Sequence, residues 1–163
     1  MEWVYDDGGR KDAGYIGEVS DCVIRSIAIA TEIPYQEVYD KMHEVCKSYR
    51  GKAGKTSSPR NGFYRQIYNR YMASIGWSWT PTMTIGSGCH VHLRANELPT
   101  GRLVVAVSKH MTAVIDGVIH DTHDPSRDGM RCVYGFFRAK EVEDGEAAHE
   151  EMDKSTIGVT AVP

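Results

Sequence analysis

The sequence predicts an α+β fold in which N-terminal helices pack on a mostly antiparallel β-sheet. Three observations support this. Helical periodicity is found in residues 20–75, strand-like segments follow from residue 77, and Asp116-Gly117 has the spacing of a two-residue hairpin turn. An order of helices first and strands afterwards is expected of α+β proteins rather than of alternating α/β folds.

Three helices are expected, over residues 20–31, 34–49 and 58–75. Ser20 or Asp21 can act as the N-cap of the first helix. Pro34 ends that helix and can begin the second, because proline fits the first helical position but not the interior. Ser58 followed by Pro59 has the pattern of a third helix start, and the apolar stripe behind it reaches residue 75.

Five strands are expected, over residues 77–85, 102–107, 110–115, 118–122 and 131–137. The stretch at 102–107 is continuously apolar, as in a strand that is buried on both faces. Residues 50–58 have no apolar anchor and are interpreted as a basic loop.

Composition restricts the class of protein. The chain has 163 residues, of which 41% are hydrophobic and 25% charged. These values, without an apolar run of 18 residues, argue against a disordered or membrane-spanning protein. The first 30 residues show no secretory signal pattern, so we expect a cytoplasmic protein. The four cysteines, Cys22, Cys46, Cys89 and Cys132, are then expected to be free thiols.

Charge separates the chain into two parts. Residues 141–163 contain seven acids and one lysine, for a net charge of −6, which leaves +3 on residues 1–140. We therefore expect one domain over residues 1–140 and a flexible acidic tail over residues 141–163.

Cys22 is the cysteine best placed for chemistry. It lies at the start of the first expected helix, where unpaired N–H groups and the helix dipole favour a thiolate. Arg25 adds a positive charge nearby, whereas the Asp21 carboxylate opposes the thiolate unless it turns to cap the helix. Free cysteines are also common in protein cores, so a structural role stays open.

A histidine and an aspartate come together in the predicted hairpin. With Asp116-Gly117 as the turn, Ile115 faces Val118. The alternation of side chains then places a polar group on one face, consisting of His110, Thr112, Asp121 and His123. Asp121 is the diagonal neighbour of His110 and close enough to orient its imidazole.

Four segments carry a family resemblance: residues 21–31, 101–105 and 110–121, and residues 126–129 together with 132–135. With them the chain resembles the papain-like cysteine peptidase superfamily, and more closely the small phage-type proteins with that fold. The resemblance extends over most of residues 14–138. It implies a compact papain-like domain and a cysteine protease or amidase, acting in the host cytoplasm if the origin is a phage.

The resemblance implies a role for each member of the site. Cys22 would be the nucleophile, His110 the general base and then acid, and Asp121 the group that orients the imidazole. The implied reaction is hydrolysis of a peptide, isopeptide or side-chain amide through a thioester, without a cofactor. A peptide or protein is the expected substrate.

The oxyanion site departs from the family pattern. Papain-like enzymes normally use a Gln upstream of the nucleophile, but residues 1–21 contain neither Gln nor Asn. The backbone N–H of Cys22 remains as one donor, and Ser20, Tyr15 or a second backbone N–H is a candidate for the other. We expect a cleft between the first helix and the hairpin, with Arg25, His123 and Arg127 as candidates for its rim.

A second interpretation is a non-catalytic papain-like protein that binds nucleic acid or a protein partner through residues 45–96. Eight basic residues and no acid lie between Glu44 and Glu97, interleaved with aromatic residues. Basic side chains neutralise phosphates and aromatic rings stack on bases. Nucleic acid is the less favoured partner, because most of these aromatic residues lie on the apolar stripe of the third expected helix.

A metal site is not expected. The two candidate clusters are Cys89, His90 and His92, and His120 with His123. In an extended chain His90 and His92 share a face, but Cys89 points to the other side, and His120 and His123 also lie on opposite faces. Tetrahedral zinc needs four convergent ligands, which neither cluster supplies by itself.

Overall fold

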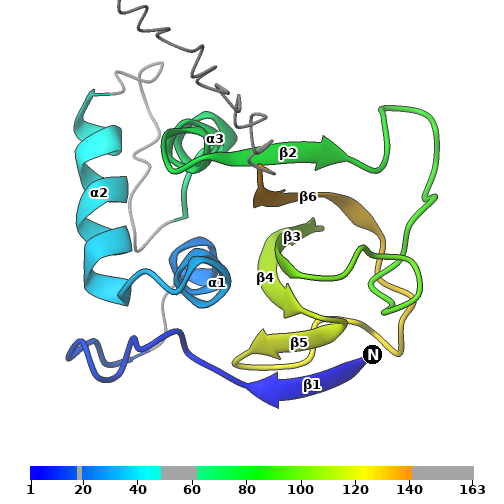
Figure 1. Ribbon diagram of the computed structural model, residues 1–163, viewed down its shortest axis with the longest axis horizontal. Helices are drawn as coiled ribbons and strands as arrows, with labels where there is room; N and C mark the ends of the chain where they lie inside the picture. Colours follow the sequence, from blue (N-terminus) through cyan, green and yellow to red (C-terminus); the bar gives the residue numbers. More distant parts are fainter. Residues whose placement is uncertain (18–19, 49–61, 141–163) are drawn as a thin grey trace, which may run out of the picture.

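The computed structural model describes residues 1–17, 20–48 and 62–140. Within these residues three helices cover one face of a six-stranded sheet, and the segment that links β2 to β3 lies on the other side (Figure 1). The predicted α+β class is confirmed. The expected basic loop, the Ser58-Pro59 helix start and the acidic tail lie outside the described residues.

The helices are α1 (Cys22–Thr31), α2 (Tyr35–Ser48) and α3 (Arg65–Ser74). The first two agree with the prediction, and α1 is almost entirely buried because it packs between α2 and the sheet. The prediction of helix at residues 62–64 is wrong. Tyr64 is extended, with φ −65° and ψ 145°, and Gly62 has a φ of 86°, so helical geometry begins only at Arg65.

The strands are β1 (Glu2–Tyr5), β2 (Trp77–Pro81), β3 (Arg102–Val107), β4 (His110–Ile115), β5 (Val118–Asp121) and β6 (Val133–Ala139). Their order in the sheet is β1-β5-β4-β3-β6-β2. All neighbours are antiparallel except β1 and β5, which are parallel. The sequence did not predict β1, whose four residues are all exposed and show no alternation.

Three strands differ from the prediction in their boundaries, and β5 differs only in ending at Asp121 rather than at residue 122. β2 stops at Pro81 instead of continuing to Ile85. β6 begins at Val133 rather than Arg131, because the residues before it pair with another segment: the Leu93 N–H donates to the Arg131 carbonyl at 2.8 Å, and His92 bridges to Cys132.

The sheet is buried on both faces. One apolar cluster lies between the helices and the sheet and includes Ile24, Ile27 and Phe137. A second cluster lies on the opposite face, where Leu93 and Leu98 cover the inner strands. This explains why β3 is continuously apolar. None of the helices in the described part of the chain combines the length and hydropathy needed to cross a bilayer.

The expectation of four free thiols is wrong, because Cys89 and Cys132 form a disulfide. These residues are 43 positions apart in sequence, but their Cα atoms lie 5.7 Å apart. The pairing of residues 91–93 with residues 131–133 brings them together, and that contact has no local sequence signal. Cys22 and Cys46 are outside the disulfide.

Candidate active site

Cys22 is the first residue of α1, as the sequence predicts, and its sulfur faces the start of β4. The sulfur accepts a hydrogen bond from the backbone N–H of Met111 and is hydrogen-bonded to the His110 imidazole. α1 packs mainly against β4, so the helix start and the strand start meet. Residues 88 positions apart in the chain are thereby placed in contact.

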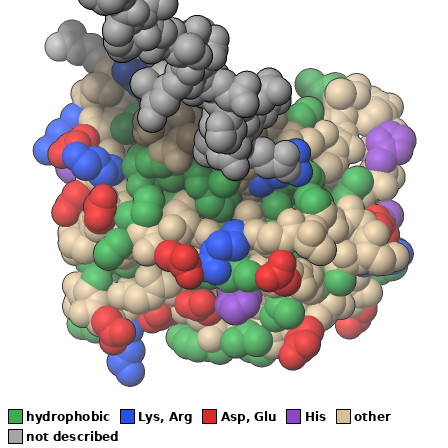
Figure 2. Space-filling model, viewed as in Figure 1, with side chains coloured by type: hydrophobic (Ala, Val, Ile, Leu, Met, Phe, Trp, Pro, Cys, Tyr) green, Lys and Arg blue, Asp and Glu red, His purple; other side chains and the backbone are tan. Residues whose placement is uncertain are grey.

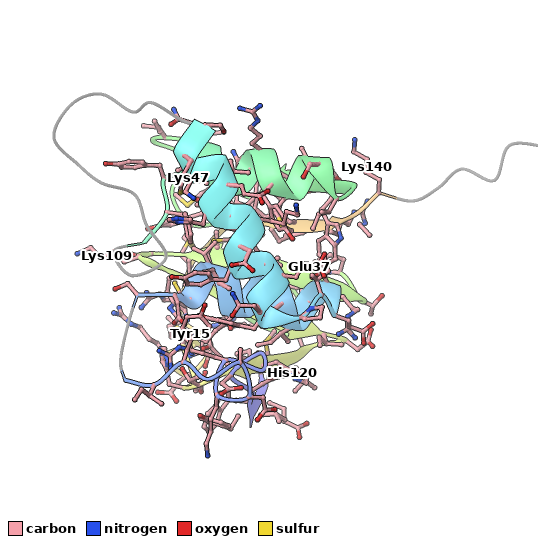
Figure 3. All side chains as sticks on the ribbon, turned by 90° about the vertical axis from the view of Figure 1, so that its left-hand side faces the viewer. Tyr15, Glu37, Lys47, Lys109, His120 and Lys140 are labelled. Carbon is pink, nitrogen blue, oxygen red and sulfur yellow. A yellow bond between two sulfur atoms is a disulfide. The ribbon has the colours of Figure 1, made fainter. Side chains whose placement is uncertain are left out.

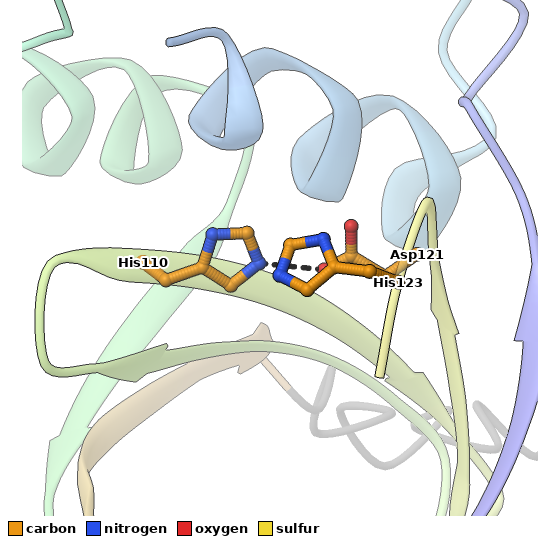
Figure 4. Close-up of side chains that lie close together, drawn as sticks. All are labelled: His110, Asp121 and His123. Atoms are coloured by element: carbon orange, nitrogen blue, oxygen red, sulfur yellow. Dashed lines mark hydrogen bonds and ion pairs between the residues drawn. The ribbon is translucent and has the colours of Figure 1, made fainter. Parts of the chain in front are cut away.

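His110 contacts Asp121 on the neighbouring strand. Its Nε2 atom lies 2.7 Å from Asp121 Oδ2, as marked in Figure 4. Nε2 is therefore engaged, which leaves Nδ1 as the ring nitrogen for the Cys22 thiol. The predicted hairpin register is confirmed, since Ile115 pairs with Val118.

The electrostatics of the three groups favour a thiolate and an imidazolium. Burial raises the pKa of the Cys22 thiol, but its hydrogen bond to His110 and the charge of the imidazole outweigh burial and hold it below 9.0. Burial lowers the pKa of His110, but its contacts with Asp121 and Cys22 raise it from 6.5 to about 9. Burial opposes ionisation of Asp121, yet the bond to His110 keeps its pKa below 3.8.

Asp21 occupies the N-cap position of α1 without capping it through its side chain. The carboxylate is 2% exposed and forms ion pairs with Arg10 Nε at 2.7 Å and Arg25 Nε at 3.0 Å. It also accepts a hydrogen bond from the Tyr35 hydroxyl at 2.8 Å. These partners offset the negative charge that was expected to oppose the Cys22 thiolate. The first N–H groups of α1 are left without a side-chain cap.

Arg25 connects α1 to the end of β5. Its guanidinium pairs with Asp21, donates to Thr122 Oγ1 and lies 3.7 Å from Asp121 Oδ1. The Asp121 backbone is held from the other side by β1, because its carbonyl accepts hydrogen bonds from Trp3 Nε1 at 3.2 Å and the Asp6 N–H at 2.9 Å. Asp121 is thus held through its carboxylate by His110 and Arg25 and through its backbone carbonyl by the segment that contains β1.

The Cys22 sulfur lies at a cavity of about 530 Å³ that Ser20 and His110 also line. Arg25 and His123, two of the three expected rim residues, instead line a separate cavity of about 580 Å³. Arg127 is exposed in a turn and lines neither cavity. Ser20 is the member of the expected set that accompanies Cys22.

The sequence did not assign four residues to the Cys22 cavity that line it: Arg65, Trp79, Lys109 and Tyr134. Arg65 and Trp79 belong to the 45–96 region of the binding interpretation. Lys109 directly precedes His110, and that adjacency was the available signal. The other three come from α3, β2 and β6, so only the packing of these elements places them beside the thiol.

One group of side chains has the composition of a metal site. The ligand atoms of His110, Asp121 and His123 all lie within 4.8 Å of one another, and the two rings have centroids 4.9 Å apart (Figure 4). Imidazole and carboxylate are both ligands that zinc accepts. The sequence places these three side chains on one face of the predicted hairpin, but only His120 and His123 are considered there as metal ligands. In the other cluster, Cys89 is in the disulfide.

Comparison of the chain with protein-family models, with curated proteins and with solved structures finds no match.

Proposed function

We propose that the protein is a papain-like cysteine hydrolase that cleaves a peptide, isopeptide or side-chain amide through a thioester. The observation that carries the proposal is the contact chain from the Cys22 thiol through His110 to Asp121, with 2.7 Å between Nε2 and Oδ2. A nucleophile hydrogen-bonded to a base, with a third group orienting that base, is the arrangement that nucleophilic catalysis requires. The α+β fold and the resemblance of residues 14–138 are consistent with it.

Acylation starts from the thiolate–imidazolium pair. The Cys22 sulfur attacks the amide carbonyl carbon, a C–S bond forms, and the carbonyl electron pair moves to oxygen. When this intermediate collapses the C–N bond breaks, and His110 gives its Nδ1 proton to the leaving amine. The neutral imidazole and an acyl thioester remain.

Deacylation reverses the role of the histidine. His110 takes a proton from water as the water oxygen attacks the thioester carbonyl carbon. The C–S bond breaks, the acid product leaves, and the thiolate–imidazolium pair is restored. Asp121 keeps Nδ1 directed at the sulfur and stabilises the charged ring throughout.

The oxyanion is stabilised from the start of α1. The backbone N–H of Cys22 has no intrahelical partner, and the N-terminal end of the helix dipole favours negative charge. Ser20 lines the same cavity and can supply a hydroxyl donor in place of the Gln side chain that the family uses. One oxyanion donor is typically worth about 100-fold to 1000-fold in rate.

The test is the rate of Cys22 alkylation by iodoacetamide as a function of pH, with Cys46 as the internal reference. The proposal predicts a Cys22 inflection below pH 9.0, because its pKa is lowered by His110. His110→Ala should move the inflection upward and slow alkylation at pH 7 about tenfold or more. His43→Ala, which alters an exposed histidine on α2, is the matched control. Equal, slow labelling of Cys22 and Cys46 would favour the non-catalytic binding interpretation.

A further inference from the structure

The cavity beside Cys22 has a wall of aromatic side chains. Phe63, Tyr68, Trp79 and Tyr134 line it, and Tyr134 is 41% exposed. Trp79 packs on Phe137 with ring centroids 4.8 Å apart, and Tyr68 packs edge-on against the same ring at 6.2 Å. The core thus holds two of the four rings in place, and they present a fixed apolar surface to the cavity.

The charges that line this cavity have one sign. Among the described lining residues, the side chains that carry a fixed charge are Arg65 and Lys109, and there is no Asp or Glu. The acidic members of the site are elsewhere: Asp121 lies behind His110, and Asp21 belongs to the other cavity. Among the described residues that line the cavity, an anion beside the thiol therefore meets two cations and no carboxylate.

The position of Arg65 is restrained. Its guanidinium carbon lies 4.8 Å from the centre of the Trp79 ring, a cation–π arrangement that fixes a long side chain. The positive charge of Arg65 and the negative charge of Cys22 both act on the Tyr68 hydroxyl, with opposite effects on its pKa. Arg65 and the Cys22 sulfur therefore both lie close enough to Tyr68 to affect its hydroxyl.

Lys109 is the second cation that lines the cavity. It occupies the β3–β4 turn with a φ of 57° and extends outward at the edge of the molecule (Figure 3). The turn is held in place by Arg131, which donates a hydrogen bond to the Ser108 carbonyl. Lys109 directly precedes His110 in the sequence, and its side chain is exposed, so its ammonium group can move to contact a bound anion.

We infer that this cavity selects an acidic substrate, with a carboxylate bound between Arg65 and Lys109 and an apolar neighbour against the aromatic wall. This inference rests on the proposed hydrolase function. The occupant is a peptide or isopeptide that bears a Glu-like or Asp-like carboxylate near the scissile amide. Guanidinium and ammonium groups both bind carboxylates, and the rings bind the apolar stem.

A nucleic acid could also bind cations and aromatic rings, but it is the less favoured ligand of this cavity. On the face shown in Figure 2, acidic and basic side chains are interspersed over the lower half. Proteins that bind single-stranded nucleic acid instead have a continuous positive groove along the phosphate backbone. Among the described residues, two cations line the cavity beside Cys22, and two cations suit a single carboxylate better than a series of phosphates.

The first experiment compares iodoacetate with iodoacetamide at Cys22. In both reactions the thiolate forms a C–S bond and iodide leaves, but only iodoacetate is an anion. The ratio of the iodoacetate rate to the iodoacetamide rate should fall about threefold in Arg65→Gln and by a similar factor in Lys109→Gln, because each variant removes one nearby cation. Arg70→Gln, which alters an exposed arginine on the same helix, should leave the ratio unchanged. Added salt should reduce the wild-type ratio.

The second experiment measures protection of Cys22 from iodoacetamide by three probes. A peptide of alternating glutamate and phenylalanine should protect more than the glutamine–phenylalanine peptide of equal length or oligothymidylate. Rapid alkylation with an unchanged rate ratio in both cavity variants overturns the acidic selectivity but leaves the hydrolase proposal intact. Stronger protection by oligothymidylate also overturns it. Failure of Cys22 to react faster than Cys46 counts against the hydrolase itself.

Discussion

The contact between His110 and Asp121 gives a quantitative prediction for Asp121→Asn. The raised pKa of His110, about 9 instead of 6.5, is the net result of burial and of its bonds to Asp121 and Cys22. Each pKa unit corresponds to about 1.4 kcal/mol, so the charged ring is stabilised by roughly 3 kcal/mol. Asp121 provides the largest favourable part. We therefore expect Asn to lower the pKa of His110 by about one to two units.

The assay is an NMR titration of the histidine rings, with the His110 resonance assigned by its absence from His110→Ala. At pH 8 a ring with a pKa of about 9 is roughly 90% protonated, whereas a pKa of about 7 leaves roughly 10%. The rate of Cys22 alkylation by iodoacetate should decrease at alkaline pH as the His110 imidazolium loses its charge. In Asp121→Asn this decrease should move to lower pH by the same amount as the pKa of His110.

Asp116→Asn is the matched control. Asp116 lies in the turn of the same hairpin, where its carboxylate accepts a hydrogen bond from the Gly101 N–H at 2.8 Å. This variant should leave the His110 titration where it is in the wild type. The reasoning is refuted if His110 titrates identically in Asp121→Asn and in the wild type, or if both aspartate variants shift it equally while remaining folded by circular dichroism.

Four further predictions follow from particular contacts. Gly135→Ala should lower the free energy of unfolding by about 2 kcal/mol or more, measured in urea, because a Cβ there would lie 2.3 Å from the Trp79 ring; an unchanged midpoint would contradict that contact. Reduction of the disulfide should lower the free energy of unfolding by up to about 4 kcal/mol, as the chain-entropy model gives for a 43-residue separation, measured by urea unfolding with and without reductant. Arg25→Gln should lower the free energy of unfolding by about 3 kcal/mol, because the buried carboxylates of Asp21 and Asp121 each lose a cationic partner. Arg25→Lys should recover part of this loss in the same assay. Zn²⁺ should slow alkylation of Cys22 reversibly with EDTA, and His123→Ala should require more than about tenfold more zinc; equal sensitivity would place the metal elsewhere.

Local patterns in the sequence determined much of this protein. The apolar periodicity and Pro34 located α1 and α2, because helix boundaries depend on side chains within a few residues. The Asp116-Gly117 turn defined the β4–β5 register and with it the proximity of His110 and Asp121, since a two-residue turn leaves one pairing of the strands. Cys22 stood out because it begins a helix.

Tertiary structure alone decided the features that join distant segments. These are the parallel pairing of β1, the Cys89–Cys132 disulfide, the bridge from Arg25 to Asp121 and the placement of Arg65 beside the thiol. Each depends on which surfaces pack together, and loop-closure entropy varies so slowly with length that it favours no particular partner. The sequence shows which residue types are present. Which of them come into contact, and so set one another's charge states, is decided by burial of the two apolar faces of the sheet.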